Sequence, residues 1–300
     1  MSSKIAAETM PNPGAETPLV VVREYDERRD KVAVNELERQ CEVGQRGKPA
    51  LVTDLMGDPI CRLRYFASHV MLVAEYGNRK EVVGTIRGCI KTVAIGKRSS
   101  NEFPIYVKLA YVFGLRVSSA HRRLGIGTKL VQQLEEWCRQ NGANYAYMAT
   151  DGSNQPSLNL FTLRCNYVKF RNPTVLVQPV HLHYKPLGSV PNIFENFGFY
   201  FLYGLHMEGK DGSNLMKSLC AFAHNMARDD KDCRVLVAEV GQMDPVREAI
   251  PHWRKFSWDQ DIWCIKKLRE AQGEDNRNSQ EYWIKSQTSS SVIFVDPRDN

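Results

Sequence analysis

The chain has 300 residues and a formal net charge of +6, with 43% hydrophobic and 25% charged residues. This length suits one large or two ordinary domains, and the apolar content supports a packed core. No apolar run approaches the length of about 18 residues that a membrane helix needs, so we expect no membrane span. The mild positive charge suits an anionic ligand, but no dense stripe of Lys and Arg predicts direct nucleic-acid binding.

Eight cysteines are scattered along the chain without a Cys-x-x-Cys pair. Most lie among apolar neighbours, as reduced core thiols do, which predicts an intracellular protein. Residues 1–17 are polar and contain several prolines, and they lack the apolar core of a signal peptide. We expect them to be a disordered leader.

The first half of the chain predicts the order strand, helix, strand, strand, strand, helix, strand. Asp26 is placed to cap the first helix, which we expect to end near Cys41. A loop-rich stretch follows and leads into a hairpin. The expected strands are residues 19–23, 70–74, 82–87, 111–117 and 144–150, the expected helices are 26–41 and 128–141, and the longer loops are 42–65 and 96–102.

Residues 121–128, His-Arg-Arg-Leu-Gly-Ile-Gly-Thr, stand between an expected strand and an expected helix. Free N–H groups at a helix start, together with the helix dipole, favour an anion there. Gly125 and Gly127 let the backbone approach a ligand and take positive φ, and Arg122 and Arg123 add charge. The spacing is that of neither a dinucleotide fingerprint nor a P-loop. The alternative is a tight turn with a solvated arginine pair.

The form Arg-x-x-Gly-x-Gly resembles the pyrophosphate loop of the GNAT (Gcn5-related) N-acetyltransferases, whose co-substrate is acetyl-CoA. The order of the expected elements and the block Asn154–Tyr167 are similar to that family too. Asn166 replaces a usual glycine, and asparagine also tolerates the left-handed conformation. The resemblance implies an α/β fold of the α+β kind: a mixed, mostly antiparallel sheet with splayed central strands, flanked by helices.

The resemblance also implies which residues hold acetyl-CoA. The splayed strand offers backbone N–H groups to the thioester carbonyl, the loop holds the pyrophosphate, and a short helix lies under the CoA. The residues implied are Leu115, Arg116, Val117, Arg122, Arg123, Leu124, Gly125, Ile126, Gly127, Thr128 and Asn154.

Acetyl transfer to an amine needs a base, and many family members use a tyrosine to protonate the departing thiolate. Phe161 stands in that tyrosine's place and donates no proton. Tyr111 stands where several members carry a base glutamate. The catalytic candidates are therefore Tyr111, Asp151 and Glu75. Each has a structural alternative: Tyr111 packs in the core, Asp151 caps a helix, and Glu75 is a surface carboxylate beside a turn.

No metal is expected. His181 and His183 share one side of an extended segment, but no third ligand lies near them in the sequence. His121 is expected to be a solvated loop residue rather than a phosphate contact.

The C-terminal third repeats part of this pattern. Residues 197–203 predict a strand, residues 208–212 form a second glycine loop, and a helix follows. Glu208 and Asp211 would repel an anion, so we expect a structural copy without cofactor. The helix is expected to bury Leu215, Met216, Leu219, Phe222 and Ala223 on one face, and later strands are expected at residues 234–240 and 262–265. A strand at residues 174–177 is expected to belong to the first unit.

Residues 19–298 as a whole resemble the plant Hookless-type N-acetyltransferases, which look like two GNAT units, the second degenerate, with a longer middle. This chain therefore looks like a shortened form. We expect its C-terminal half to pack as a partial sheet beside the first domain. The blocks that carry the resemblance are residues 22–26, 216–220, 250–253, 261–266 and 293–298. The expected division is a leader (1–17), a GNAT domain (18–180), a linker (181–192) and a partial, degenerate GNAT-like unit (193–300).

The resemblance implies an acetyl-CoA-dependent N-acetyltransferase acting on a primary amine, a protein or histone lysine among the candidates, with a role in hormone-responsive plant growth. Its partners would be acetyl-CoA and the amine acceptor, without a membrane. The alternative is a catalytically weak or inactive acyl-CoA-binding regulator or scaffold. The missing tyrosine and the shortened second unit favour that alternative, and the complete Arg-x-x-Gly-x-Gly loop opposes it.

Overall fold

The structure is a computed structural model that describes residues 20–41, 55, 57–94, 106–180, 197–254, 257, 261–269 and 296. The strands are β1 (Val20–Glu24), β2 (Ser68–Tyr76), β3 (Glu81–Ala94), β4 (Tyr106–Val117), β5 (Tyr145–Asp151), β6 (Val168–Arg171), β7 (Pro173–Pro179), β8 (Gly198–Leu202), β9 (Cys233–Gly241) and β10 (Asp261–Lys267). The helices are α1 (Glu27–Gln40), α2 (Ile126–Gln140), α3 (Gln155–Asn159), α4 (Gly212–Asp229) and α5 (Val246–Ala249), with shorter turns η1 (Leu63–Tyr65), η2 (Ser119–His121) and η3 (Leu160–Arg164). The expected leader and linker, the loop at 96–102, His181 and His183 lie outside the described residues.

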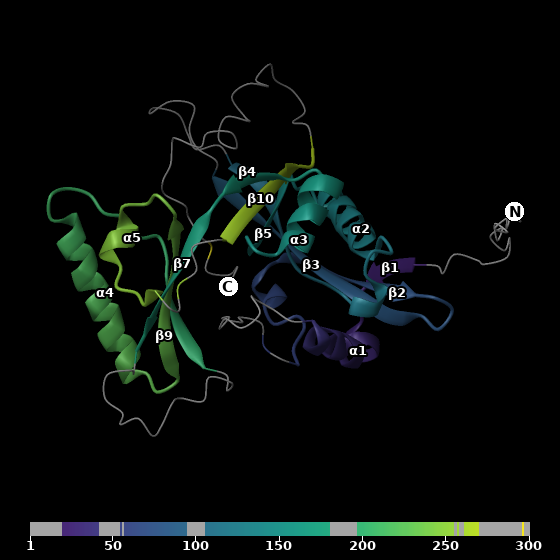
Figure 1. Cartoon of the computed structure of the whole chain (residues 1–300), viewed down its shortest axis with the longest axis horizontal. Coiled ribbons are helices and arrows are strands. Elements are labelled where there is room, and N and C mark those ends of the chain that lie inside the picture. Colours follow the sequence, from purple (N-terminus) through teal and green to yellow (C-terminus); the bar gives the residue numbers. More distant parts are fainter. Residues whose placement is uncertain are drawn as a thin grey trace, which may run out of the picture.

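The described elements form two β-sheets with helices packed against them (Figure 1). One sheet has the strand order β1-β2-β3-β4-β5-β10-β6, and the other has the order β7-β9-β8. In the larger sheet, most neighbours are antiparallel and β4 and β5 are parallel. This arrangement is a mixed, mostly antiparallel α+β fold, as expected.

The N-terminal elements form where the local sequence predicts them. Asp26 caps α1 by accepting hydrogen bonds from the N–H groups of Arg28 and Arg29. The hairpin of β2 and β3 is confirmed, and both arms are longer than expected. Asn166 has φ +60, which confirms the left-handed conformation expected there.

The central strands β4 and β5 diverge toward their C-terminal ends. They pair only where Leu109–Tyr111 faces Tyr145–Tyr147. Beyond that point β4 follows β3 alone, with a bulge opposite the step from Thr85 to Arg87. Gly114 in this bulge has φ +62, and a Cβ there would lie 2.3 Å from Nη1 of Arg87. Only glycine fits both conditions, so the bulge helps to fix the splay.

Helices cover the larger sheet on both faces (Figure 1). The core beneath α2 includes Leu130, Leu134 and Met148, whereas the core on the α1 face includes Val34 and Tyr111. Residues that alternate along each strand therefore enter different cores. No helix in the described ranges is long and apolar enough to cross a membrane.

The two sheets exchange strands across the expected domain boundary. β10, from the C-terminal third, lies between β5 and β6 and is antiparallel to both. In Figure 1 it appears yellow-green among the teal strands of the first half of the chain. β7, which lies within residues 18–180, pairs with β9 of the other sheet. The structure thus differs from the expected division near residue 180, because periodicity predicts that a strand exists and not which sheet receives it.

The smaller sheet carries α4 on one face. β8 runs parallel to β9, and α4 packs over β9 and α5. The expected apolar face of α4 is wrong in part: Met216 and Cys220 are buried, whereas Leu215, Leu219 and Phe222 are more than 60% exposed. In the larger sheet, β3 lies beside β4 and packs against α2. Within the described residues, β8 is an edge strand, so no further strand covers these side chains of α4.

Candidate functional site

The loop before α2 leaves the start of the helix open to a ligand. Arg123 has φ +65 and Gly125, the N-cap of α2, has φ +79. Gly125 has no side chain that could cap this helix start, so within the described residues its first N–H groups keep their capacity to bind an anion. Gly127 lies where a Cβ would be 3.2 Å from Cδ2 of Leu160, which brings α2 close to η3.

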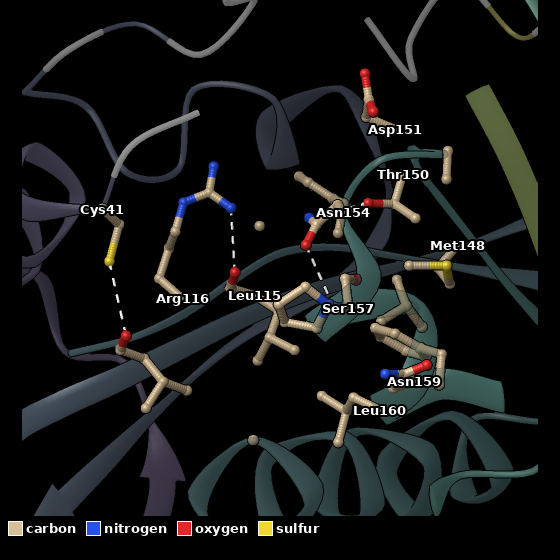
Figure 2. A pocket seen from close by; sticks show the side chains of 18 of the residues that line it. Cys41, Leu115, Arg116, Met148, Thr150, Asp151, Asn154, Ser157, Asn159 and Leu160 are labelled. Carbon is tan, nitrogen blue, oxygen red and sulfur yellow. Dashed lines mark hydrogen bonds between the residues drawn. The ribbon is translucent and has the colours of Figure 1, made fainter. Parts of the chain in front are cut away.

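A cavity of about 2180 Å³ is lined by this loop and by the diverging parts of β4 and β5. Residues of α3 also line this cavity, and Figure 2 shows part of the lining from close by. Leu124 is 51% exposed and does not line the cavity. The other residues implied for acetyl-CoA all line it: Leu115, Arg116, Val117, Arg122, Arg123, Gly125, Ile126, Gly127, Thr128 and Asn154.

Two backbone carbonyls in the diverging part of β4 accept hydrogen bonds from side chains, because β5 no longer pairs with β4 there. The oxygen of Leu115 accepts a hydrogen bond from Nη1 of Arg116 at 3.1 Å. The oxygen of Val117 accepts one from Nε of Arg122 at 3.4 Å and a weak one from Sγ of Cys41 at 3.9 Å. Figure 2 shows the Arg116 and Cys41 contacts. The unpaired edge of β4 therefore lines the cavity, and its carbonyl oxygens accept hydrogen bonds from flexible side chains.

Asn154 orders the other wall of the cavity. Its side chain caps α3 by accepting from the N–H of Ser157 at 3.3 Å, and it donates to Oγ1 of Thr150 at 3.2 Å (Figure 2). The cap of α3 is therefore Asn154. Asp151 instead accepts hydrogen bonds from the backbone N–H and hydroxyl of Ser153. The helix-cap alternative for Asp151 is wrong.

A smaller pocket of about 190 Å³ continues the cavity at the ends of β5 and β10. Asp151 and Asp261 are cross-strand partners here. Glu239 of β9 and Arg62 also line this pocket. Burial, with the charge of Asp151 in second place, raises the pKa of Asp261 to about 6. Sequence reasoning missed Asp261 and Glu239, because each belongs to a strand more than 80 residues away from β5 in the chain.

A row of aromatic rings forms the floor beside these carboxylates. The ring centroids of Tyr111 and Tyr147 lie 4.8 Å apart, and those of Tyr147 and Trp263 lie 5.7 Å apart. Tyr111 also stacks on Phe113 at 4.9 Å and is 8% exposed. Tyr111 therefore packs in the core, as its structural alternative predicts, and it also lines the pocket. A catalytic role for it stays a prediction.

Glu75 does not line either pocket. It is only 4% exposed and forms ion pairs with Arg23, at 2.8 Å, and with Arg29. Arg23 also pairs with Asp30 of α1 at 2.7 Å. Glu75 is therefore a structural anchor between β1, β2 and α1. The structure supports neither its candidacy as a base nor its description as a surface carboxylate.

Phe161 and His121 both border the large cavity. Phe161 is 2% exposed and packs edge-on against Tyr167 with centroids 5.1 Å apart. His121 packs its ring against Tyr76 at 4.8 Å and is half-buried. No group of three or more potential metal ligands gathers in the described part of the chain.

The fold and this site define an acetyltransferase of the GNAT class, and comparisons with known proteins agree. The model of the acetyltransferase (GNAT) family matches residues 33–167. "Probable N-acetyltransferase HLS1" of Arabidopsis thaliana is 38% identical over 407 residues, which cover 94% of this chain and all of that protein. "Acetyl transferase GW6a" of rice is 33% identical over 415 residues, covering 94% and 97%. The chain belongs to the GNAT family and is an N-acetyltransferase.

The Arabidopsis relative is longer than this chain. The alignment with it spans 407 positions against 300 residues here, so more than a hundred of those positions have no counterpart in this chain. Among solved structures, yncA of Salmonella typhimurium with acetyl-CoA aligns over 86% of this chain and 99% of its own, at 12% identity and a TM-score of 0.43. Arabidopsis NAA60 with a bisubstrate analogue aligns over 54% and 88%, at 15% identity and a TM-score of 0.37.

Proposed function

We propose that this chain binds acetyl-CoA and transfers its acetyl group to a primary amine. The observation that carries the proposal is a large cavity lined by the start of α2 and by the diverging parts of β4 and β5, together with a smaller pocket of carboxylates and aromatic rings that shares lining residues with it. A long ligand with an anionic end and a reactive far end fits such a cavity.

The residues around α2 suit the pyrophosphate. Arg122 and Arg123 supply charge, and the N–H groups that follow Gly125 supply hydrogen bonds without a competing cap. The acidic loop at residues 208–212 does not line the cavity. We therefore propose the first loop alone as the pyrophosphate site.

The diverging edge of β4 suits the pantetheine arm. An arm that contains amides can add to this edge as a strand does, donating to the carbonyls of Leu115 and Val117. The contacts from Arg116, Arg122 and Cys41 that now satisfy these carbonyls are long or come from flexible side chains. They can exchange for the ligand without disturbing the sheet, because β3 holds the other edge of β4.

Acetyl-CoA supplies an activated acyl group as a thioester. The chain's own part is to orient that group through β4 and to direct backbone N–H groups of Leu115–Val117 at its carbonyl oxygen. Phe161 shields the cavity from water on the η3 side. No acid is obligatory for the leaving group, because a thiol with a pKa of about 8.5 departs readily as thiolate.

The acceptor belongs to this proposal as well. A protein or histone lysine is our first candidate, and the likeness to plant relatives favours a role in hormone-responsive growth in the cytoplasm or nucleus. The test has two stages. Calorimetric titration with acetyl-CoA measures binding, and thiol release with a panel of small amines and lysine peptides, histone sequences included, then measures transfer.

The second candidate function is an acyl-CoA-binding regulator without turnover. Phe161 in the place of a tyrosine favours it, as does a smaller sheet with only three strands among the described residues. Binding of acetyl-CoA together with no thiol release from any amine in the panel is the outcome that selects it. Absence of binding would remove both functions.

A further inference from the structure

Asp151 and Asp261 point to the same side of the larger sheet. They are directly opposed on the antiparallel strands β5 and β10, and opposed residues project to the same face. Tyr147 and Trp263 are separated from them by even numbers of residues along the two strands, so both rings project to this face as well. Two carboxylates thus end a row of aromatic rings.

This side of the larger sheet is opposite the side that α2 covers. Tyr147 and Ile265 belong to the core on the α1 side, whereas Met148 and Cys264 belong to the core beneath α2. The gap between β4 and β5 connects the two faces, and Tyr111, Asp151 and Asp261 line both the large cavity and the smaller pocket. An acyl group that enters from the α2 side therefore meets a second molecule that enters from the carboxylate side.

Three other charged residues line the smaller pocket with Asp261: Asp151 of β5, Glu239 of β9, and Arg62, which directly precedes η1. Arg171 of β6 is the strand partner of Trp263. The indole Nε1 of Trp263 is buried, and no residue of the described part accepts its hydrogen. The three carboxylates and the aromatic faces of this pocket suit a cationic amine. The buried indole N–H adds a donor that can bind an acceptor atom of a ligand.

We propose that Asp261 is the base that takes a proton from the attacking amine, and that Asp151 and Glu239 hold the amine as its ammonium form arrives. This inference rests on the proposed function. The ammonium nitrogen loses one proton to Asp261 and forms the C–N bond as the C–S bond breaks. The second proton of the nitrogen ends on the CoA thiolate, and Asp261 returns its proton to water. The products are an N-acetyl amine and CoA thiol.

Asp261 suits this role better than Asp151. Asp151 accepts two hydrogen bonds from Ser153, which stabilise its charged form. Asp261 accepts no hydrogen bond within the described residues, and burial beside Asp151 places its pKa at about 6. A base whose pKa is near the working pH is both largely ionised and basic enough to accept a proton.

The strand exchange makes the C-terminal third part of this acceptor site. Asp261 comes from β10 and Glu239 from β9, and both lie outside the region matched by the family model. The smaller sheet is therefore more than a structural copy, because it supplies one wall of the place where the amine binds.

The test uses the full chain, with whichever amine of the panel gives the fastest thiol release. Asp261→Asn should lower kcat by about 100-fold, with the KM for acetyl-CoA within about twofold. We expect the kcat/KM of the wild type to fall below pH 6 and Asp261→Asn to remove this fall. Glu239→Gln should raise the KM for the amine more than it lowers kcat. Asp229→Asn, at an exposed carboxylate at the end of α4, is the matched control and should leave all these parameters unchanged.

Acetyl-CoA affinity and circular dichroism of each variant show whether it is folded, and Asp261→Glu should recover part of the rate. If Asp261→Asn is folded and keeps the wild-type kcat and pH profile, this inference is overturned while the proposed function stands. If no amine releases thiol from the wild type although acetyl-CoA binds, the proposed function fails and the inference fails with it.

Discussion

Arg123 combines charge and an uncommon backbone conformation in the loop before α2. It has φ +65, two residues before Gly125 at φ +79, and its side chain is exposed. A non-glycine residue in the left-handed region marks a tightly turned loop whose N–H groups point to one side. The residue thus contributes both to the shape of the phosphate loop and to its charge.

We expect Arg123→Glu to weaken acetyl-CoA binding by at least about tenfold, or about 1.4 kcal/mol, because an anion then faces the pyrophosphate. Calorimetric titration at low and moderate salt measures this. Lys210→Glu, in the second glycine loop, is the matched control and should leave the dissociation constant unchanged. An equal effect of both substitutions would show that only the net charge matters and not the loop.

Asp261 also couples stability to pH. Its pKa of about 6 in the folded chain is above the usual value for aspartate of about 3.9. A raised pKa means that its favourable contribution to stability is complete below about pH 4 and is lost as the pH rises through 6. We expect Asp261→Asn to be more stable than the wild type at pH 8, by about 1 to 3 kcal/mol, and nearly equal to it at pH 4.

Urea unfolding of the two chains at pH 4 and pH 8 checks this expectation. Asp229→Asn serves again as the control, with no dependence of its effect on pH. A destabilisation by Asp261→Asn at both pH values would mean that Asp261 is a structural residue, and it would weaken its assignment as a base.

At the scale of elements, α2 and α4 carry similar sequence patterns in different surroundings. Leu134 and Leu219 both stand seven positions after the second glycine of their loops. Leu134 is fully buried, and its Cδ1 lies 2.7 Å from where a Cβ on Gly88 of β3 would be. Leu219 is 62% exposed. The helices have the same apolar spacing, and a neighbouring strand decides whether the apolar side chains are buried.

We expect Leu134→Ala to destabilise the chain by about 2 to 5 kcal/mol, because it removes buried contacts and leaves a cavity. Leu219→Ala should change the free energy of unfolding by no more than about 0.5 kcal/mol. Chemical denaturation followed by circular dichroism compares the two variants. A large loss of stability in Leu219→Ala would mean that the exposed stripe of α4 is covered in solution.

The whole molecule is held together by the exchange of β7 and β10. Cys264 and Ile265 of β10 are fully buried in the two cores of the larger sheet. Lys266 of β10 also donates to Glu135 of α2 at 2.7 Å. Burying an Ile-sized side chain contributes about 1.5 to 3 kcal/mol, so one buried strand matters against a net stability of about 5 to 15 kcal/mol.

We therefore expect a fragment of residues 18–180 to lose the cooperative fold of the full chain. Its larger sheet would lack β10 between β5 and β6, and its β7 would have no β9 to pair with. Thermal unfolding followed by circular dichroism, with limited proteolysis beside it, compares the fragment with the full chain. A fragment that melts cooperatively at the temperature of the full chain would contradict the structural importance of the exchange.

Local patterns predicted most elements because their causes are local. Asp26 caps α1 through N–H groups two and three residues away, and the loop before α2 depends on glycine and on neighbouring charges. The phosphate loop and the hairpin of β2 and β3 are of this kind. Patterns failed where burial depends on a distant partner. Leu219 is exposed, and Glu75 is buried beside Arg23 and Arg29.

The sequence by itself determined the order of the elements, the glycine loop before α2 and the family of this protein. These depend on residues close together in the chain, where spacing fixes geometry. Only the tertiary structure decided that β10 enters the larger sheet and that Asp261 stands opposite Asp151. That pairing joins residues 110 positions apart. The pairing of strands so far apart in the chain depends on how their side chains pack in the core, and a local sequence pattern does not determine that packing.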